Sequence, residues 1–166
     1  MSVFQQDILS QAPRELRFHR EVAHDTPADA LLETLNGRII GVACSVDASG
    51  DVNLIALATT TDVALIRTRA GLTSRSQSCL RRLFGGEVTL VGFDMPKLAL
   101  YVRRGLGYQV QGVDLSTAFS KSTVSPLTPA AIVKARLYQS DVRRVRAVWA
   151  EETHDNVRLR AWVAAW

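Results

Sequence analysis

The sequence predicts a single α/β domain in which helices flank a mixed β-sheet. Three short apolar runs, at residues 39–44, 53–59 and 63–66, are separated by turn-like segments, a pattern typical of an antiparallel meander. After Gly71, amphipathic stretches alternate with short apolar runs, which indicates helices packed on the faces of a sheet. The 166 residues are enough for one domain to bury its own core. We therefore expect three layers with the sheet in the middle.

The first 37 residues are predicted to form an N-terminal helical segment ahead of the main domain, which spans residues 38–150. Thr26 suits the N-cap of a helix, and Pro27 suits its first position because the missing amide hydrogen is not needed there. Apolar residues then recur at helical spacing until Gly37.

Helices and strands are predicted to alternate along the second half of the main domain. Residues 73–84 place apolar side chains on one helical face and arginines on another, which indicates an amphipathic helix. Residues 88–91 favour a buried strand, residues 96–104 a helix ended by a Gly-Leu-Gly sequence, and residues 108–113 another strand. The small polar residues over 116–125 favour a loop.

One long helix is predicted at the end of the main domain. Thr128 and Pro129 suit its start, and apolar residues from Ile132 to Trp149 recur every three or four positions. The remaining residues, 151–166, carry apolar side chains and are expected to pack on the domain or on a partner.

Composition narrows the classes of function. The net charge of +4 and the pI near 9.5 are compatible with binding to a phosphate backbone. Cys44 and Cys79 lack the spacing of a zinc site or disulfide framework, so we expect reduced thiols. Residues 1–10 lack a secretory pattern, and no apolar run is long enough to span a bilayer. We expect an intracellular protein, nuclear or cytoplasmic with organelles left open, that needs no cofactor.

Three stretches resemble, in order, the landmarks of the ribonuclease D and Werner-type DEDD 3′→5′ exonuclease family. The first consists of residues 39–45, 54–59 and 63–66, which resemble the family's opening hhGhDxE, then its LIQLAT, then a short strand. The second, residues 90–98, is similar to the family's VGHNxxxD turn into a helix, and residues 113–115 are similar to its later D-T/L segment.

The third stretch, residues 126–135, resembles the family's PLTxxQIxYAAxDA motif. Together the three stretches cover residues 38–150, and their order and spacing carry the resemblance. It implies a ribonuclease H-like three-layer fold. The region between Asp114 and Pro126 is shorter than in the family, so a helix and a loop are expected to be missing there.

The resemblance also implies that this chain lacks the family's catalytic acids. Active members use four carboxylates to hold two divalent metal ions. Lys134 stands where a tyrosine would orient the attacking water. The positions of the four acids carry side chains that cannot bind metal in this way, namely Ala43, Ser45, Leu98 and Tyr138. We therefore expect a pseudo-exonuclease with no catalytic or metal-binding residues.

An alternative is an active metal-dependent 3′→5′ exoribonuclease with relocated acidic ligands. Asp47, Asp94 and Asp141 lie close in sequence to the expected positions. Each also has a structural interpretation: Asp47 forms a turn, Asp94 caps the following helix, and Asp141 lies on the surface. The non-catalytic interpretation is favoured because three relocations would have to converge on one site.

Basic residues of the predicted long helix are candidates for binding RNA. They lie near the position of the family's active site, where the loss of acids also removes repulsion of phosphates. Their alternative interpretation is the solvated face of an amphipathic helix. These candidates are Lys134, Arg136, Arg143, Arg144 and Arg146.

Three tryptophans near the C-terminus, Trp149, Trp162 and Trp166, are candidates for binding a protein partner or a second copy. Their alternative is a last helix that packs on the domain's own sheet. The resemblance implies the first role, because inactive members of the family serve as adaptors in RNA-processing complexes. The predicted function is a protein-binding adaptor in an RNA-processing or RNA-regulatory complex, with direct RNA contact as an addition and no membrane partner.

Overall fold

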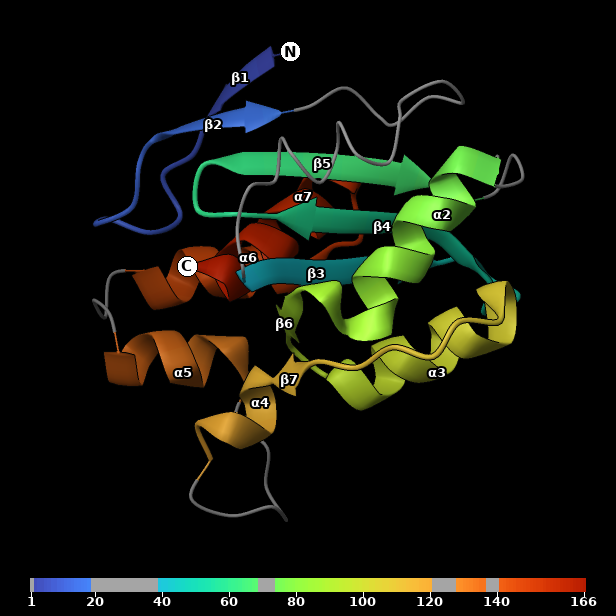
Figure 1. Cartoon of the computed structure of the whole chain (residues 1–166). Coiled ribbons are helices and arrows are strands. Elements are labelled where there is room, and N and C mark those ends of the chain that lie inside the picture. Colours follow the sequence, from blue (N-terminus) through green and yellow to red (C-terminus); the bar gives the residue numbers. More distant parts are fainter. Residues whose placement is uncertain (1, 19–38, 69–73, 121–127, 137–140) are drawn as a thin grey trace.

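A seven-stranded mixed sheet forms the centre of the computed structural model, which describes residues 2–18, 39–68, 74–120, 128–136 and 141–166 (Figure 1). Strands β3, β4 and β5 are antiparallel neighbours, whereas β6 pairs in parallel with β3 and with β7. The mixed sheet with an antiparallel meander is therefore confirmed. In the sheet order, the strands are β1 (Ser2–Gln5), β2 (Glu15–Phe18), β5 (Asp62–Arg67), β4 (Val52–Ala58), β3 (Ile39–Val46), β6 (Thr89–Gly92) and β7 (Val113–Asp114).

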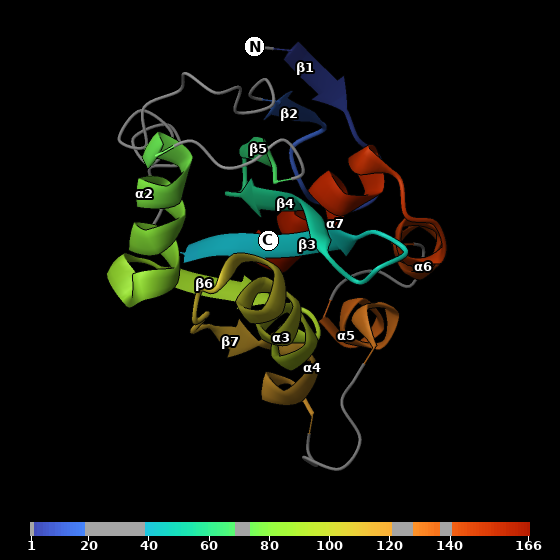
Figure 2. The same ribbon diagram turned by 90° about the vertical axis from the view of Figure 1, so that its right-hand side faces the viewer.

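Helices cover both faces of this sheet, as Figure 2 shows with α2 on one side of the strands and α7 on the other. The predicted three layers are thus present. The helices are α2 (Ser74–Arg82), a π-helical turn η1 (Leu83–Glu87), α3 (Met95–Leu106), α4 (Leu115–Ala118), α5 (Pro129–Arg136), α6 (Asp141–Ala150) and α7 (His154–Ala165).

Two separate hydrophobic clusters fill the spaces between the layers. Strand β5 shows the reason, because successive side chains of a strand point to opposite faces. Val63 and Leu65 join the cluster beneath α6 and α7, whereas Ala64 and Ile66 join the cluster beneath α2 and α3. Since both faces of β5 are buried, its sequence is a continuous apolar run.

Gly41 allows α7 to approach the sheet at backbone distance. A Cβ atom at this position would lie 1.9 Å from the Ala161 carbonyl oxygen and 2.8 Å from the Ala165 amide nitrogen. No side chain fits in that space, so the contact between β3 and α7 depends on glycine.

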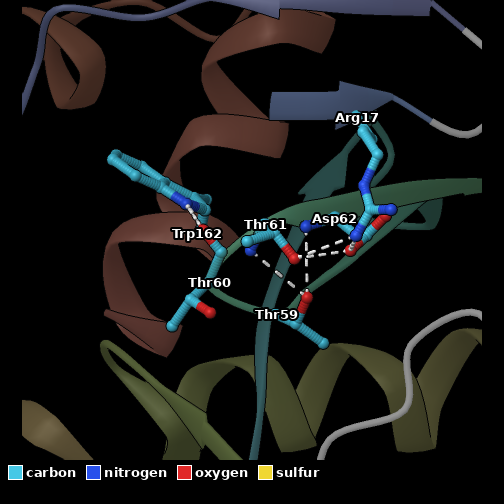
Figure 3. Close-up of polar contacts among 6 residues, drawn as sticks. All are labelled: Arg17, Thr59, Thr60, Thr61, Asp62 and Trp162. Carbon is cyan, nitrogen blue, oxygen red and sulfur yellow. Dashed lines mark hydrogen bonds and ion pairs between the residues drawn. The ribbon is translucent and has the colours of Figure 1, made fainter. Parts of the chain in front are cut away.

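The turn between β4 and β5 makes polar contacts with both β2 and α7 (Figure 3). Arg17 of β2 donates to the Asp62 carboxylate over 2.6 Å, and its main-chain amide donates to the Thr61 carbonyl over 2.9 Å. On the other side of the turn, the Trp162 indole Nε1 donates to the Thr60 carbonyl over 2.9 Å. The turn therefore connects β2 to α7.

The N-terminal segment differs from the helical prediction. Residues 2–5 and 15–18 are the antiparallel strands β1 and β2, and β2 continues the main sheet by pairing in parallel with β5. The place of this pair in the sheet depends on partners of β2 that lie more than forty residues away along the chain, for example Asp62 opposite Arg17, so local periodicity could not reveal it. The helix predicted from Thr26 lies outside the described residues.

Three other predictions for the second half need correction. The strand predicted over 108–113 is reduced to β7, and the loop predicted over 116–125 begins with the short helix α4. The single long helix is two helices, α5 and α6, with residues 137–140 outside the described part.

The helix predicted at 96–104 is confirmed as α3, which ends at Gly107 with φ of 76°.

Within the described ranges, no helix has the length and apolar character needed to cross a membrane.

Candidate functional site

A pocket of about 220 Å³ lies beside the second half of β3. Strand β6 pairs only with residues 39–41 of β3, so the rest of β3 borders this pocket near the carboxyl ends of the two parallel strands. We call it the central pocket. Its walls come from β3, the turn after β6, α3, α6 and α7, and they include Ala43, Cys44, Phe93, Asp94, Lys97, Leu98, Tyr101, Trp149, Glu152 and Arg160.

The pocket includes two of the four positions at which the resemblance leads us to expect the family's acids. Ala43 and Leu98 line it, and Ser45 of the same strand is buried beside it without reaching its wall. Tyr138 lies outside the described residues, as does the side chain of Lys134. Over the described ranges, no three His, Cys, Asp or Glu side chains gather closely enough to hold a metal ion.

Two of the three candidate relocated acids have structural roles. The Asp47 carboxylate accepts hydrogen bonds from the Ser49 and Asp51 amides, at 2.9 and 3.1 Å, which is the expected turn role. Asp141 is 1% exposed, so the surface position predicted for it is wrong. Its carboxylate accepts from the Ser10 amide over 3.0 Å and from the Ser10 hydroxyl, and it thereby holds the β1–β2 connection against α6.

Asp94 is the one candidate relocated acid that lines the central pocket. It has φ of 57° and ψ of 44°, a left-handed conformation that Asp adopts more readily than most residues. The predicted cap is wrong, because its side chain makes no capping hydrogen bond. Instead the Asp114 carboxylate accepts from the first amide of α3, that of Met95, over 3.2 Å.

Arg160 brings a partly buried positive charge into the pocket. Its Nε donates to the Val148 carbonyl over 3.1 Å and its Nη2 to the Glu151 carbonyl over 2.8 Å, so the guanidinium satisfies carbonyls at the end of α6. It also lies 5.9 Å from the centre of the Trp149 ring. Burial lowers the pKa of Arg160, while the charge of Glu152 opposes that shift.

Cys44 is an unreactive group in this setting. Burial is the main cause that raises the pKa of its thiol to about 11, and the negative charge of Glu152 adds to the shift. Thiolate formation is therefore negligible near neutral pH, in keeping with a reduced thiol. The side chain of Cys79 is outside the described part.

The candidate RNA-binding arginines of α6 are not equivalent. Arg143 and Arg146 are exposed. Arg144 is also exposed, but it donates to the Asp7 carbonyl over 2.5 Å, and its Nε lies 3.8 Å from the Asp7 carboxylate. The side chains of Lys134 and Arg136 on α5 lie outside the described set.

The three candidate tryptophans lie in three different environments. Trp149 is half-buried in the pocket wall, with its ring centre 5.3 Å from that of Phe93 in an edge-to-face arrangement. Trp162 is fully buried in the core, so its predicted contact with a partner is wrong. Trp166 is 47% exposed and remains available to a partner.

Sequence reasoning did not single out five polar or aromatic residues of the pocket, namely Phe93, Lys97, Tyr101, Glu152 and Arg160. Glu152 and Arg160 lie in residues 151–166, beyond the stretch that resembles the exonuclease family. Helix α7 brings Arg160 to the pocket by packing on β3. Arg158 and Arg160, which interrupt the apolar residues between Val157 and Val163, were the available signal.

No protein-family model and no curated protein matches the chain significantly. Among solved structures, it is similar to the POL domain of Pol1 from M. smegmatis in complex with DNA primer-template and dNTP, with a TM-score of 0.57 and 18% identity. That match covers 89% of this chain and 25% of the other. The chain thus spans a quarter of the length of its first structural relative.

It is also similar to the Aedes aegypti Nibbler EXO domain, with a TM-score of 0.51 and 16% identity over 82% of this chain and 76% of that one. At such low identities the likeness shows the fold alone. That fold is the exonuclease-type, ribonuclease H-like α/β architecture, as predicted.

Proposed function

We propose that this chain is a non-catalytic exonuclease-like module that acts as a protein-binding adaptor in an intracellular RNA-processing or RNA-regulatory complex. One observation carries the non-catalytic part: the central pocket is lined by Ala43 and Leu98 at positions that the family reserves for metal-binding acids. The likeness to the Nibbler EXO domain supports the exonuclease-like fold of this module.

The charges of the pocket also disfavour a divalent cation. Mg²⁺ and Ca²⁺ sites are built from several charged oxygen ligands. Here two carboxylates, Asp94 and Glu152, share the pocket with two cations, Lys97 and Arg160. The cations offset the carboxylates, so the pocket has no net negative charge to attract a metal ion.

The alternative, an active exoribonuclease with relocated ligands, would need Asp94 and Glu152 to act with a third acid. Asp141 is held by Ser10, and Asp47 is occupied in its own turn. Neither lines the central pocket. Of the three candidate relocated acids, only Asp94 therefore lines the central pocket, where Glu152 is the other carboxylate of the described wall.

The adaptor part is supported by apolar side chains on the surface. Trp166 at the end of α7 is 47% exposed and Leu100 on α3 is 64% exposed. Large exposed apolar side chains are frequent at protein interfaces. Trp166→Ala is the variant that tests partner binding, since Trp162 belongs to the core.

RNA degradation tests the non-catalytic part. We expect a labelled single-stranded RNA to stay intact when the protein is added with Mg²⁺ or Mn²⁺, because the pocket lacks a ligand set for either ion. Metal-dependent shortening from the 3′ end, lost in Asp94→Ala and kept in Asp47→Ala, would establish the alternative. Asp47 is the matched control because it lies outside the pocket wall.

A further inference from the structure

Trp149 separates the central pocket from a second hollow of about 460 Å³. The second hollow lies between the start of α5 and the outer side of α6, where its wall includes Thr128, Pro129, Val145 and Arg146. Trp149 lines both hollows, so they are neighbours that share this residue in their walls. We call the two hollows together the Trp149 groove.

Positive side chains are spaced along the Trp149 groove. Lys97 of α3 and Arg160 of α7 lie in the central pocket, and Arg146 of α6 lies in the second hollow. They come from three different helices. A chain of phosphates that crosses Trp149 would therefore meet a cation on each side of the ring.

Arg160 has unused capacity to bind an anion. Its Nε and Nη2 donate to main-chain carbonyls, which leaves Nη1 without an acceptor among the described residues. In the same part of the chain, no carboxylate lies within ion-pair distance of its guanidinium. Glu152 acts on this half-buried cation only from beyond ion-pair distance. An anion that accepts a hydrogen bond from Nη1 would stabilise the cation further.

The two carboxylates of the pocket weaken this preference without reversing it. Asp94 and Glu152 are exposed, whereas Arg160 is half-buried. Water and salt screen exposed charges more strongly than partly buried ones. The least screened charge in the pocket is therefore positive.

Aromatic side chains alternate with these cations. Trp149 packs against Phe93, and Tyr101 lies beneath the Lys97 ammonium, which is 5.8 Å from the centre of its ring. Unpaired bases stack on such rings regardless of their sequence, and cations beside the rings hold the phosphates. A duplex cannot use the rings in this way because its bases are already stacked on each other.

We propose that the Trp149 groove binds a single-stranded nucleic acid without any metal ion, with Arg160 and Lys97 holding phosphate in the pocket where active relatives hold metal. This inference rests on the proposed function, because it requires a pocket free of metal. Arg146 holds phosphate on the far side of Trp149, and the indole stacks on a base.

Binding in the presence of EDTA tests the inference. The probes are a fluorescent single-stranded RNA of about ten nucleotides, the DNA of the same sequence, and the matching RNA duplex. We expect both single strands to raise the fluorescence anisotropy at low salt and the duplex to bind at least about tenfold more weakly. The two single strands together show whether the 2′-hydroxyl contributes.

Variants locate the contact. Trp149→Ala is expected to weaken single-strand binding by about tenfold or more, through lost stacking. Lys97→Ala and Arg146→Ala are each expected to weaken it about fivefold and to lower the salt dependence by about one counterion. Arg103→Ala on α3 and Arg143→Ala on α6 remove the same charge outside the groove wall and are the matched controls.

Arg160→Gln is the direct test of the phosphate contact. The melting temperature of this variant must be checked, because Arg160 also donates hydrogen bonds to carbonyls at the end of α6. If that variant does not fold, Lys97→Ala against Arg103→Ala decides. No single-strand binding in EDTA would overturn the inference, as would equal losses in groove and control variants. Cleavage of RNA in Mn²⁺ would instead overturn the proposed function, so the two failures are distinguishable.

Discussion

Gly41→Ala is expected to lower the free energy of unfolding by about 3 kcal/mol or more, a large share of what a domain of this size has. The added methyl group would lie 1.9 Å from the Ala161 carbonyl oxygen. This oxygen and the Ala165 amide nitrogen, the two obstructing atoms, belong to the main chain of α7, so no side-chain rotation relieves the overlap. Helix α7 must move away from β3, which opens the core. Urea unfolding followed by circular dichroism measures the loss.

Gly85→Ala is the matched control for this change. A Cβ atom at Gly85 would have no neighbour within 4 Å, and its φ is not positive. We expect its free energy of unfolding to stay within about 0.5 kcal/mol of the wild type. Equal stability of Gly41→Ala and Gly85→Ala would contradict the close packing of α7 on β3.

Trp162→Ala is expected to destabilise the domain by about 4 kcal/mol. The indole is fully buried, and its removal leaves a large cavity between α7 and the sheet. It also removes the hydrogen bond to the Thr60 carbonyl in the β4–β5 turn (Figure 3). The free energy of unfolding from urea titration is the readout.

Trp166→Ala separates the two roles that tryptophan can have in α7. Trp166 is 47% exposed, so we expect a loss of less than about 1 kcal/mol in the free energy of unfolding. If Trp162→Ala lowered the free energy of unfolding as little as Trp166→Ala does, Trp162 would not be a core residue. Its predicted contact with a partner would then be supported.

The central sheet could be predicted from the sequence because its signals are local. Strands β3, β4 and β5 are apolar runs joined by short turns, and each pairs with its neighbour in the chain. Strands β1 and β2 carry no such signal, since β2 finds its place through Arg17 and Phe18 against β5. One continuous apolar period also suggested a single long helix where α5 and α6 are separate.

The candidate site could be predicted in part. The resemblance located Ala43 and Leu98, and both line the central pocket. Arg160 and Glu152 were missed because packing of α7 on Gly41 brings this segment to the pocket, and sequence spacing does not encode that contact. Trp162 was misassigned because hydrophobicity alone does not distinguish a core residue from an interface residue.

Titration calorimetry with Mn²⁺ tests the central claim most directly, because metal binding must precede any exonuclease chemistry of this type. We predict only the heat of dilution, for the wild type and for Asp94→Ala alike, since Lys97 and Arg160 offset the two carboxylates of the pocket. A saturable heat in the wild type that disappears in Asp94→Ala, and persists in Asp47→Ala, would contradict the account and show that the pocket holds metal.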